Sequence, residues 1–234
     1  MDAVIGWRRG INYRANMDAL KRSGVTDVVS GSACGSLREE LTPRTLVLVD
    51  QFVDRTVGRP ASFFGNGMVG HVSMADPVSP LLAQQISDAA APGIALHNGG
   101  TYLTIEGPQV STRAESRLYQ SWGCDVIGMT NMPEARLARG AEYCYATLAM
   151  VTDYDCWRPG AVSVPEMLAG MANNIETVQR LIGRLCADMP RTHPPCPVGS
   201  DRALDFALVT APDKRDPEIL KLFDAIAGRV LGPA

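Results

Sequence analysis

Short apolar runs and amphipathic segments alternate along the chain, and this alternation constrains the fold more than any other feature of the sequence. Runs rich in apolar and β-branched residues predict strands at 26–33, 45–53, 101–107, 124–130 and 145–152. Apolar residues at helical spacing predict helices at 12–23, 79–90, 111–122, 133–143, 164–186 and 216–230. Strands and helices that alternate in this way form an α/β fold, so we expect a largely parallel or mixed central β-sheet flanked by helices.

The length and composition narrow the class of protein. A chain of 234 residues, of which 46% are hydrophobic, suits one large domain over 1–234 better than two. A net charge of −3 and the lack of a basic stripe argue against a nucleic-acid partner. The sequence holds no run of eighteen apolar residues and no secretory signal, so we expect no membrane span and a cytoplasmic protein. Six cysteines without metal-finger spacing fit a reducing compartment and predict no metal site.

Two acidic residues directly follow the apolar run at 145–151. Asp153 and Asp155 would lie on the same side of the chain if it stayed extended. The carboxyl ends of strands in an open α/β sheet are where ligands bind. Asp is also common in strand-end turns and at helix N-caps, so spacing alone leaves both interpretations open.

Small and hydroxyl-bearing residues gather at other predicted strand ends, at 30–36 and 128–130. Free backbone N–H groups among such residues can bind an anion, although a tight turn explains the same pattern.

Several blocks of sequence carry a resemblance to a known family. They are SGSACGSLREE (30–40), DQFVDRTVGRPASFF (50–64), TIEGPQVSTRAES (104–116), and DVIGMTNMPEARLAR (125–139) followed by CYATLAMVTDYDCW (144–157). In this order they resemble the 5′-methylthioadenosine phosphorylases of the trimeric purine nucleoside phosphorylase family, most strongly over residues 11–185. The resemblance implies a mixed, barrel-like sheet, a homotrimer, and phosphorolysis of methylthioadenosine to adenine and 5-methylthioribose 1-phosphate in purine and methionine salvage. Inorganic phosphate would be the co-substrate, and no cofactor is expected.

The resemblance also gives the two acidic residues roles. The transition state would resemble an oxocarbenium ion, and the purine is a poor leaving group unless its developing negative charge is neutralised. Asp153, the first acid of the TDYDCW block, would handle the proton that neutralises it. Asp155 would support the amino edge of the purine. Because family members specific for 6-oxopurines typically carry Asn at the first position, Asp153 favours adenine. A phosphorylase for methylthioinosine or another 6-oxopurine nucleoside is the alternative.

The remaining site residues follow from the same match. Ser32, Ala33 and Thr130 would hold phosphate, and His71 would reach the 5′ substituent in a neighbouring subunit's site. The expected substrate contacts are Val110, Ile127, Gly128, Met129, Val164, Met167 and Leu168. Taken alone, His71 is typical of a surface residue, and Met129 of a core residue.

The segment 54–75 predicts a long loop, and loops of that length are usually functional or interfacial. It carries Phe63, Phe64 and Met68, apolar side chains that would otherwise face water. We therefore expect a neighbouring subunit of the homotrimer to cover them.

The sequence departs from the family in two respects. Val110 stands where the family usually has Phe, which removes an aromatic contact worth about 0.5–1.5 kcal/mol. The family's glycine-rich phosphate loop and Arg-His-Gly element do not occur, and Arg8 and Arg9 do not match their spacing. We expect the family's N-terminal strands to be missing and phosphate to bind weakly. A truncated, non-catalytic chain that binds nucleosides or associates with other subunits is therefore a second alternative.

Overall fold

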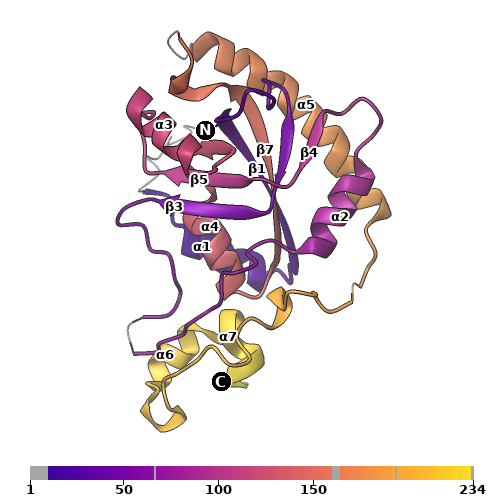
Figure 1. Cartoon of the computed structure of the whole chain (residues 1–234). Coiled ribbons are helices and arrows are strands. Elements are labelled where there is room, and N and C mark those ends of the chain that lie inside the picture. Colours follow the sequence, from indigo (N-terminus) through magenta and orange to yellow (C-terminus); the bar gives the residue numbers. More distant parts are fainter. Residues whose placement is uncertain (1–9, 66, 160–163, 193, 233–234) are drawn as a thin grey trace, which may run out of the picture.

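A seven-stranded mixed sheet flanked by helices forms the centre of the protein (Figure 1). The computed structural model describes residues 10–65, 67–159, 164–192 and 194–232. In chain order the elements are α1 (Tyr13–Arg22), β1 (Asp27–Ser36), β2 (Leu46–Val49), β3 (Gln51–Arg55), α2 (Pro80–Ala89), β4 (Leu96–Asn98), β5 (Thr101–Ile105), α3 (Arg113–Ser121), β6 (Val126–Gly128), α4 (Asn131–Gly140), β7 (Cys144–Asp153), α5 (Val164–Asp188), α6 (Pro217–Leu222) and α7 (Asp224–Leu231). The expected α/β class with a mixed sheet is confirmed.

The strand order is β3-β5-β6-β1-β7-β2-β4. Strands β1 and β7 are parallel neighbours at the centre, whereas β6 and β2 run antiparallel to them. In the β1–β7 register Gly35 pairs with Asp153, after an irregularity that follows Cys34. The carboxyl ends of the two central strands therefore meet at one edge of the sheet.

Strand β7 is buried on both faces, which explains its continuous apolar sequence. Ala146, Leu148 and Met150 pack into a core cluster with side chains of α2 and α5. Ala149 and Val151 point the other way, into a cluster with residues of β2, β5 and β6. Buried residues of α1, α4 and α7 form a further cluster.

The expected strand over 45–53 is wrong in one respect, because it is two strands separated by Asp50. Strand β2 lies near one end of the sheet order and β3 lies at the other. A single residue can connect them only if the sheet curls, as the barrel-like expectation requires. Asp50 fixes the bend, since its N–H donates to the Gly100 carbonyl at 3.2 Å and its Oδ1 accepts from the Gly100 N–H at 3.1 Å.

Two other expectations need correction at the element level. The short strand β4 was not predicted, and the closing helix expected over 216–230 is divided at Phe223 into α6 and α7. Figure 1 shows these two helices at one end of the molecule, next to the C-terminus.

Two apolar side chains of the 54–75 loop, Phe64 and Met68, are buried within the chain. Phe64 and Met68 are 8% and 0% exposed, and the Phe64 ring stacks on Phe223 of the C-terminal segment at a centroid distance of 5.5 Å. Phe64 and Met68 therefore need no neighbouring subunit to bury them, and that expectation is wrong. None of the helices in the described part of the chain has both the length and the hydrophobicity that a membrane span requires.

Candidate active site

A cavity of about 130 Å³ opens where the ends of β6 and β7 meet β1. Acidic residues line one part of it and apolar residues another. The lining residues are Ala33, Cys34, Gly35, Ile105, Val110, Ile127, Gly128, Met129, Thr152, Asp153, Asp155 and Met167. The structure thus brings together eight of the residues expected at the site, from strands and loops that are far apart in the sequence.

Asp153 is the last residue of β7, and its carboxylate is held on both oxygens. Its Oδ2 accepts from the Thr152 hydroxyl at 2.8 Å, and its Oδ1 accepts from the Asp155 N–H at 2.8 Å. A Cβ added at Gly35 would lie 3.1 Å from Asp153 Oδ1 and 3.1 Å from Asp155 Cβ. The glycine in β1 therefore lets the central strand come close to both acids.

Asp155 lies in a turn and not in an extended chain. Its φ is +50°, and it begins the 3₁₀ helix Asp155–Trp157. The chain therefore does not stay extended from Asp153 to Asp155, and the two acids do not share one side of a strand. Both nevertheless line the cavity. The side chain is 8% exposed, and Oδ2 accepts from the Ser116 hydroxyl at 2.6 Å. Burial raises the pKa of Asp155, while its hydrogen bonds with Ser116 and the Cys156 N–H oppose that rise.

Ser116 reaches Asp155 because of where α3 begins. Thr112 caps the helix through a capping box, in which its hydroxyl accepts from the Glu115 N–H and the Glu115 carboxylate accepts from the Thr112 N–H. The cap fixes the start of the helix, and Ser116, one turn along, is fully buried.

Three hydroxyl groups, from β1, β5 and the N-cap of α4, meet beside the cavity. Ser32 Oγ lies 2.8 Å from Tyr102 Oη and 2.7 Å from Thr130 Oγ1. A Cβ at Gly128 would lie 1.7 Å from Tyr102 Oη, so only glycine fits there. Ser32 and Thr130 were expected to hold phosphate together with Ala33, which lines the cavity. Neutral hydroxyl and N–H donors placed in this way can bind an oxyanion.

The apolar wall is formed by the loops that leave β5 and β6. Val110 is 48% exposed at the mouth, and Ile127 is 4% exposed. Gly107 has a φ of +69°, and a Cβ there would lie 2.5 Å from Met129 Sδ. The two loops are therefore in close contact, and this contact depends on glycine.

Two expected substrate contacts, His71 and Leu168, are not found in the cavity, and a third falls outside the described residues. His71 is exposed and lines a separate cavity of about 280 Å³ with Phe63 and Phe64. Leu168 is 62% exposed and is absent from the lining. The side chain of Val164, the first residue of α5, lies outside the described residues. The role of His71 at a neighbour's site stays a prediction.

Several polar residues around the cavity were not predicted from the sequence. Tyr102, Ser116 and Thr152 hold the predicted residues by hydrogen bonds. Ser111, beside Val110, has a buried Oγ that makes no hydrogen bond within the described part of the chain. A buried tyrosine needs a hydrogen-bond partner for its hydroxyl. Tyr102, in the Thr-Tyr pair that begins β5, could therefore have been predicted from the sequence to contact another polar residue.

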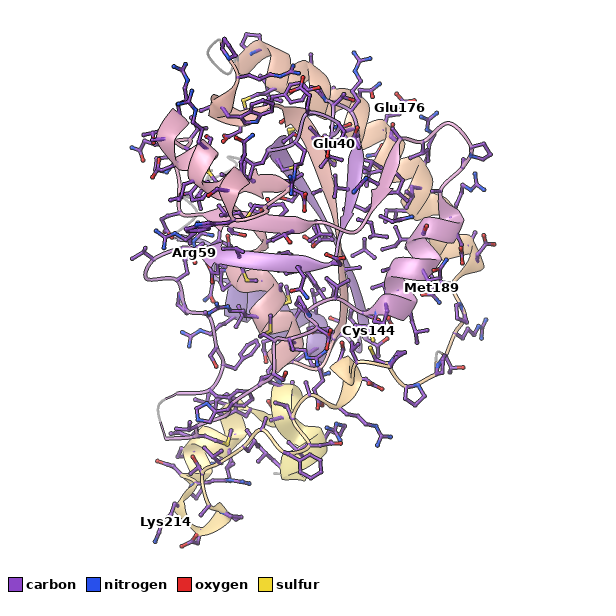
Figure 2. All side chains as sticks on the ribbon, viewed as in Figure 1. Glu40, Arg59, Cys144, Glu176, Met189 and Lys214 are labelled. Carbon is purple, nitrogen blue, oxygen red and sulfur yellow. The ribbon has the colours of Figure 1, made fainter. Side chains whose placement is uncertain are left out.

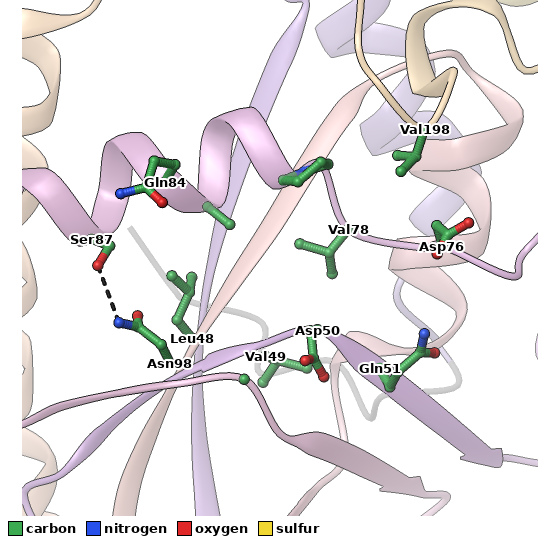
Figure 3. A pocket seen from close by; sticks show the side chains of 13 residues that line it. Leu48, Val49, Asp50, Gln51, Asp76, Val78, Gln84, Ser87, Asn98 and Val198 are labelled. Atoms are coloured by element: carbon green, nitrogen blue, oxygen red, sulfur yellow. Dashed lines mark hydrogen bonds between the residues drawn. The ribbon is translucent and has the colours of Figure 1, made fainter.

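A larger cavity of about 430 Å³ lies between α2 and the end of β2 (Figure 3). Asp50, Gln51 and Asp76 contribute polar atoms to it, and Asn98 Nδ2 donates to Ser87 Oγ at 3.2 Å (Figure 3). Of the residues expected at the active site, none whose side chain is described lines this cavity. No cluster of metal-ligating side chains occurs in the described ranges either. We therefore assign the candidate active site to the smaller cavity.

Comparison with known proteins agrees with this geometry. The sequence profile of the Phosphorylase superfamily matches residues 5–187. A relative from Bradyrhizobium diazoefficiens named S-methyl-5′-thioadenosine phosphorylase is 62% identical over 224 residues, which cover 94% of this chain and 77% of the relative. A relative of the same name from Cereibacter sphaeroides is 58% identical, with the same coverage.

Solved structures of methylthioadenosine phosphorylases are similar to this chain as well. A methylthioadenosine phosphorylase from an antarctic soil metagenomic library superposes with a TM-score of 0.87 at 43% identity, covering 94% of this chain and 78% of that one. The Schistosoma mansoni methylthioadenosine phosphorylase in complex with adenine has a TM-score of 0.74 at 34% identity, covering 77% of this chain and 71% of that one. A profile match over most of the chain, together with relatives of this identity and coverage, means that the chain belongs to the Phosphorylase superfamily.

Proposed function

We propose that the protein cleaves S-methyl-5′-thioadenosine with inorganic phosphate, giving adenine and 5-methylthioribose 1-phosphate. One observation carries the proposal: the Asp153 carboxylate faces a small, apolar-walled cavity that adjoins the hydroxyl groups of Ser32 and Thr130. A flat purine and an oxyanion could occupy these adjacent regions together. The names of the relatives support the same substrate.

In the proposed reaction a phosphate oxygen forms a bond to C1′ of the ribose while the bond from C1′ to N9 of the purine breaks. The bonding electrons pass to the purine, and the Asp153 side chain holds the proton that neutralises the leaving base at N7. The transition state resembles an oxocarbenium ion, as in glycoside cleavage. Ser32, Thr130 and the N–H of Ala33 orient the phosphate oxygens, and Asp155 supports the amino edge of the base.

The apolar residues set the position of the substrate. Ile127, Gly128 and Met129 lie along the base and ribose, and Val110 closes the mouth. We assign Val164, Met167 and Leu168 to the methylthio group and His71 to the site of a neighbouring subunit, in a cytoplasmic homotrimer. An apolar pocket of this kind prefers methylthio over hydroxyl by about 1–3 kcal/mol.

Substitution of Asp153 tests the proposal. Asp153→Ala should lower the rate of adenine release from methylthioadenosine and phosphate by about 10²–10⁴-fold, because it removes the proton-handling group. Asp153→Asn should shift the preference toward 6-oxopurine nucleosides, because an amide can donate to O6.

The exposed Asp213, whose side chain is 70% exposed, provides the control, and Asp213→Ala should leave the rate unchanged. Equal adenine release by wild type and Asp153→Ala would contradict the assignment. Failure of the wild-type chain to release adenine would contradict the proposed function itself.

A further inference from the structure

We infer that Arg59 is a positioning residue that locks the purine side of the proposed site to its phosphate side. The inference rests on the proposed function. Arg59 lies in the loop after β3 (Figure 2), and its side chain is only 2% exposed. It does not line the cavity. A buried guanidinium this close to a proposed site is costly to desolvate unless its donors are satisfied, so its partners indicate its role.

One side of the guanidinium holds the segment between β6 and α4. Nη1 donates to the Met129 carbonyl at 2.8 Å and to the Met132 carbonyl at 2.7 Å. These two carbonyls flank Thr130, the residue assigned to phosphate. Arg59 therefore fixes the backbone on both sides of the phosphate-binding hydroxyl.

The other side holds the end of β5. Nη2 donates to the Glu106 carbonyl at 2.8 Å and to the Ile105 carbonyl at 3.5 Å, and Nε donates to Glu106 Oε2 at 3.1 Å. From here the chain continues through Gly107 to Val110, the purine wall. All five N–H donors of the planar guanidinium are thus directed at the exits of two adjacent strands.

No local cap performs this task at the start of α4. Thr130 occupies the N-cap position, but its side chain makes no capping bond and its hydroxyl contacts Ser32 instead. The side chain of the next residue, Asn131, is buried and has no hydrogen-bond partner among the described residues. The N-terminus of α4 is therefore oriented from outside the helix, by Arg59.

Lysine could not replace this arrangement. An ammonium group has three donors around one nitrogen, whereas the guanidinium spans two strand exits with a rigid fork. Because Gly107 and Met129 are in close contact, a shift of either loop moves the other. Misplacement of reacting groups by about 1 Å can cost about 10²-fold in rate, so loss of the fork should affect both substrates together.

A structural role without consequence for the site is the competing explanation, and Arg139 provides a matched control. It is 6% exposed and donates to Ser200 Oγ and to the Val198 carbonyl, both at 2.7 Å. These partners belong to the C-terminal segment and do not line the proposed site. Arg139→Lys should therefore lower thermal stability in the way that Arg59→Lys does, without a selective effect on the reaction.

The experiment compares the two variants at a temperature where circular dichroism shows both to be folded. Arg59→Lys should raise KM for methylthioadenosine and for phosphate and lower kcat/KM by about 10–10²-fold, whereas Arg139→Lys should change each by less than about threefold. Amide hydrogen exchange should become faster at 105–112 and 127–133 in Arg59→Lys only. The exchange readout does not depend on the identity of the substrate.

Glu106→Gln is the milder second variant, because it removes the charge that pairs with Nε and accepts from the Val57 N–H, but keeps the bonds from Arg59 to the backbone carbonyls. It should shift both KM values in the same direction as Arg59→Lys, by less. The inference is overturned if Arg59→Lys and Glu106→Gln leave both KM values, kcat and amide exchange equal to those of wild type. A wild-type chain that neither binds adenine nor releases it would count against the proposed function, while the exchange comparison would still decide the role of Arg59.

Discussion

Asp155 combines burial with a carboxyl group, and this makes the stability of the protein depend on pH. Burial raises its pKa above the usual value of 3.8. Between that value and the raised folded value, the unfolded chain binds fewer protons than the folded one. The contribution of Asp155 to folding stability is therefore fully present below about pH 3.8 and is lost as pH rises through this window.

Asp155→Asn should remove this dependence. Asn tolerates a φ of +50° and cannot ionise, so the variant should gain stability relative to wild type as pH rises from about 4 to about 7. Thermal unfolding followed by circular dichroism across this range measures the difference in Tm. A difference that stays constant or shrinks with rising pH would show that Asp155 carries no raised pKa.

At the scale of elements, the contact between β5 and β6 depends on one glycine. These strands pair in parallel, with Thr104 opposite Gly128, and a Cβ at Gly128 would collide with Tyr102. Gly128→Ala should lower the free energy of unfolding by about 1–3 kcal/mol, because β6 must move or Tyr102 must leave Ser32. Adenine binding should weaken as well, since Gly128 lines the cavity.

Gly183→Ala in α5 is the control for this prediction. An added Cβ there meets nothing within 4 Å, and Ala favours the helix by about 1 kcal/mol over Gly. Urea unfolding should therefore show opposite signs for the two substitutions. A loss at Gly128 no larger than the change at Gly183 would mean that the β5–β6 contact is more adaptable than the structure indicates.

Some helices and strands could be predicted from the sequence, and others could not. Strand β7 and helix α5 were located to within a few residues, because long buried or amphipathic runs carry a clear periodicity. The break at Asp50 was missed because apolar residues continue on both sides of it. Strand β4 has only three residues, too few for a pattern.

The residues of the candidate site likewise fall into those that could be predicted from the sequence and those that could not. Asp153 and Met129 lie in blocks whose residue types match a known family, so they could be placed from the sequence. Tyr102, Ser116 and Arg59 act through partners that are distant in the sequence and come near only once the strand order is known. Hydrogen-bond partners of this kind are a property of the topology and leave little trace in local sequence.

For the molecule as a whole, Glu142 joins the C-terminal segment to the sheet. It is 5% exposed, and its carboxylate accepts from Arg229 of α7 and, at 2.9 Å, from the N–H of Leu204. Glu142→Gln should lower the free energy of unfolding by about 1.5–3 kcal/mol, the usual contribution of charged hydrogen bonds. Denaturant titration measures it.

The exposed pair Lys221–Glu218 provides the comparison for this prediction. Glu218→Gln should cost less than about 1 kcal/mol, because solvent screens both charges. Equal losses for the two substitutions would contradict the anchoring role of Glu142. A loss for Glu142→Gln with adenine binding retained would support it.

The parallel pairing of β1 with β7 also has a consequence for the order of folding. All of residues 37–143 lie between these two strands, so the contact that forms the centre of the sheet is among the most non-local in the protein. Such contacts carry a large loop-closure entropy and form slowly. Because Asp153 meets Gly35 only across this pairing, the cavity does not exist in any intermediate in which the two halves of the chain have folded separately. A nucleoside therefore recognises only the completed fold, and its binding stabilises that state at the expense of every partly folded one.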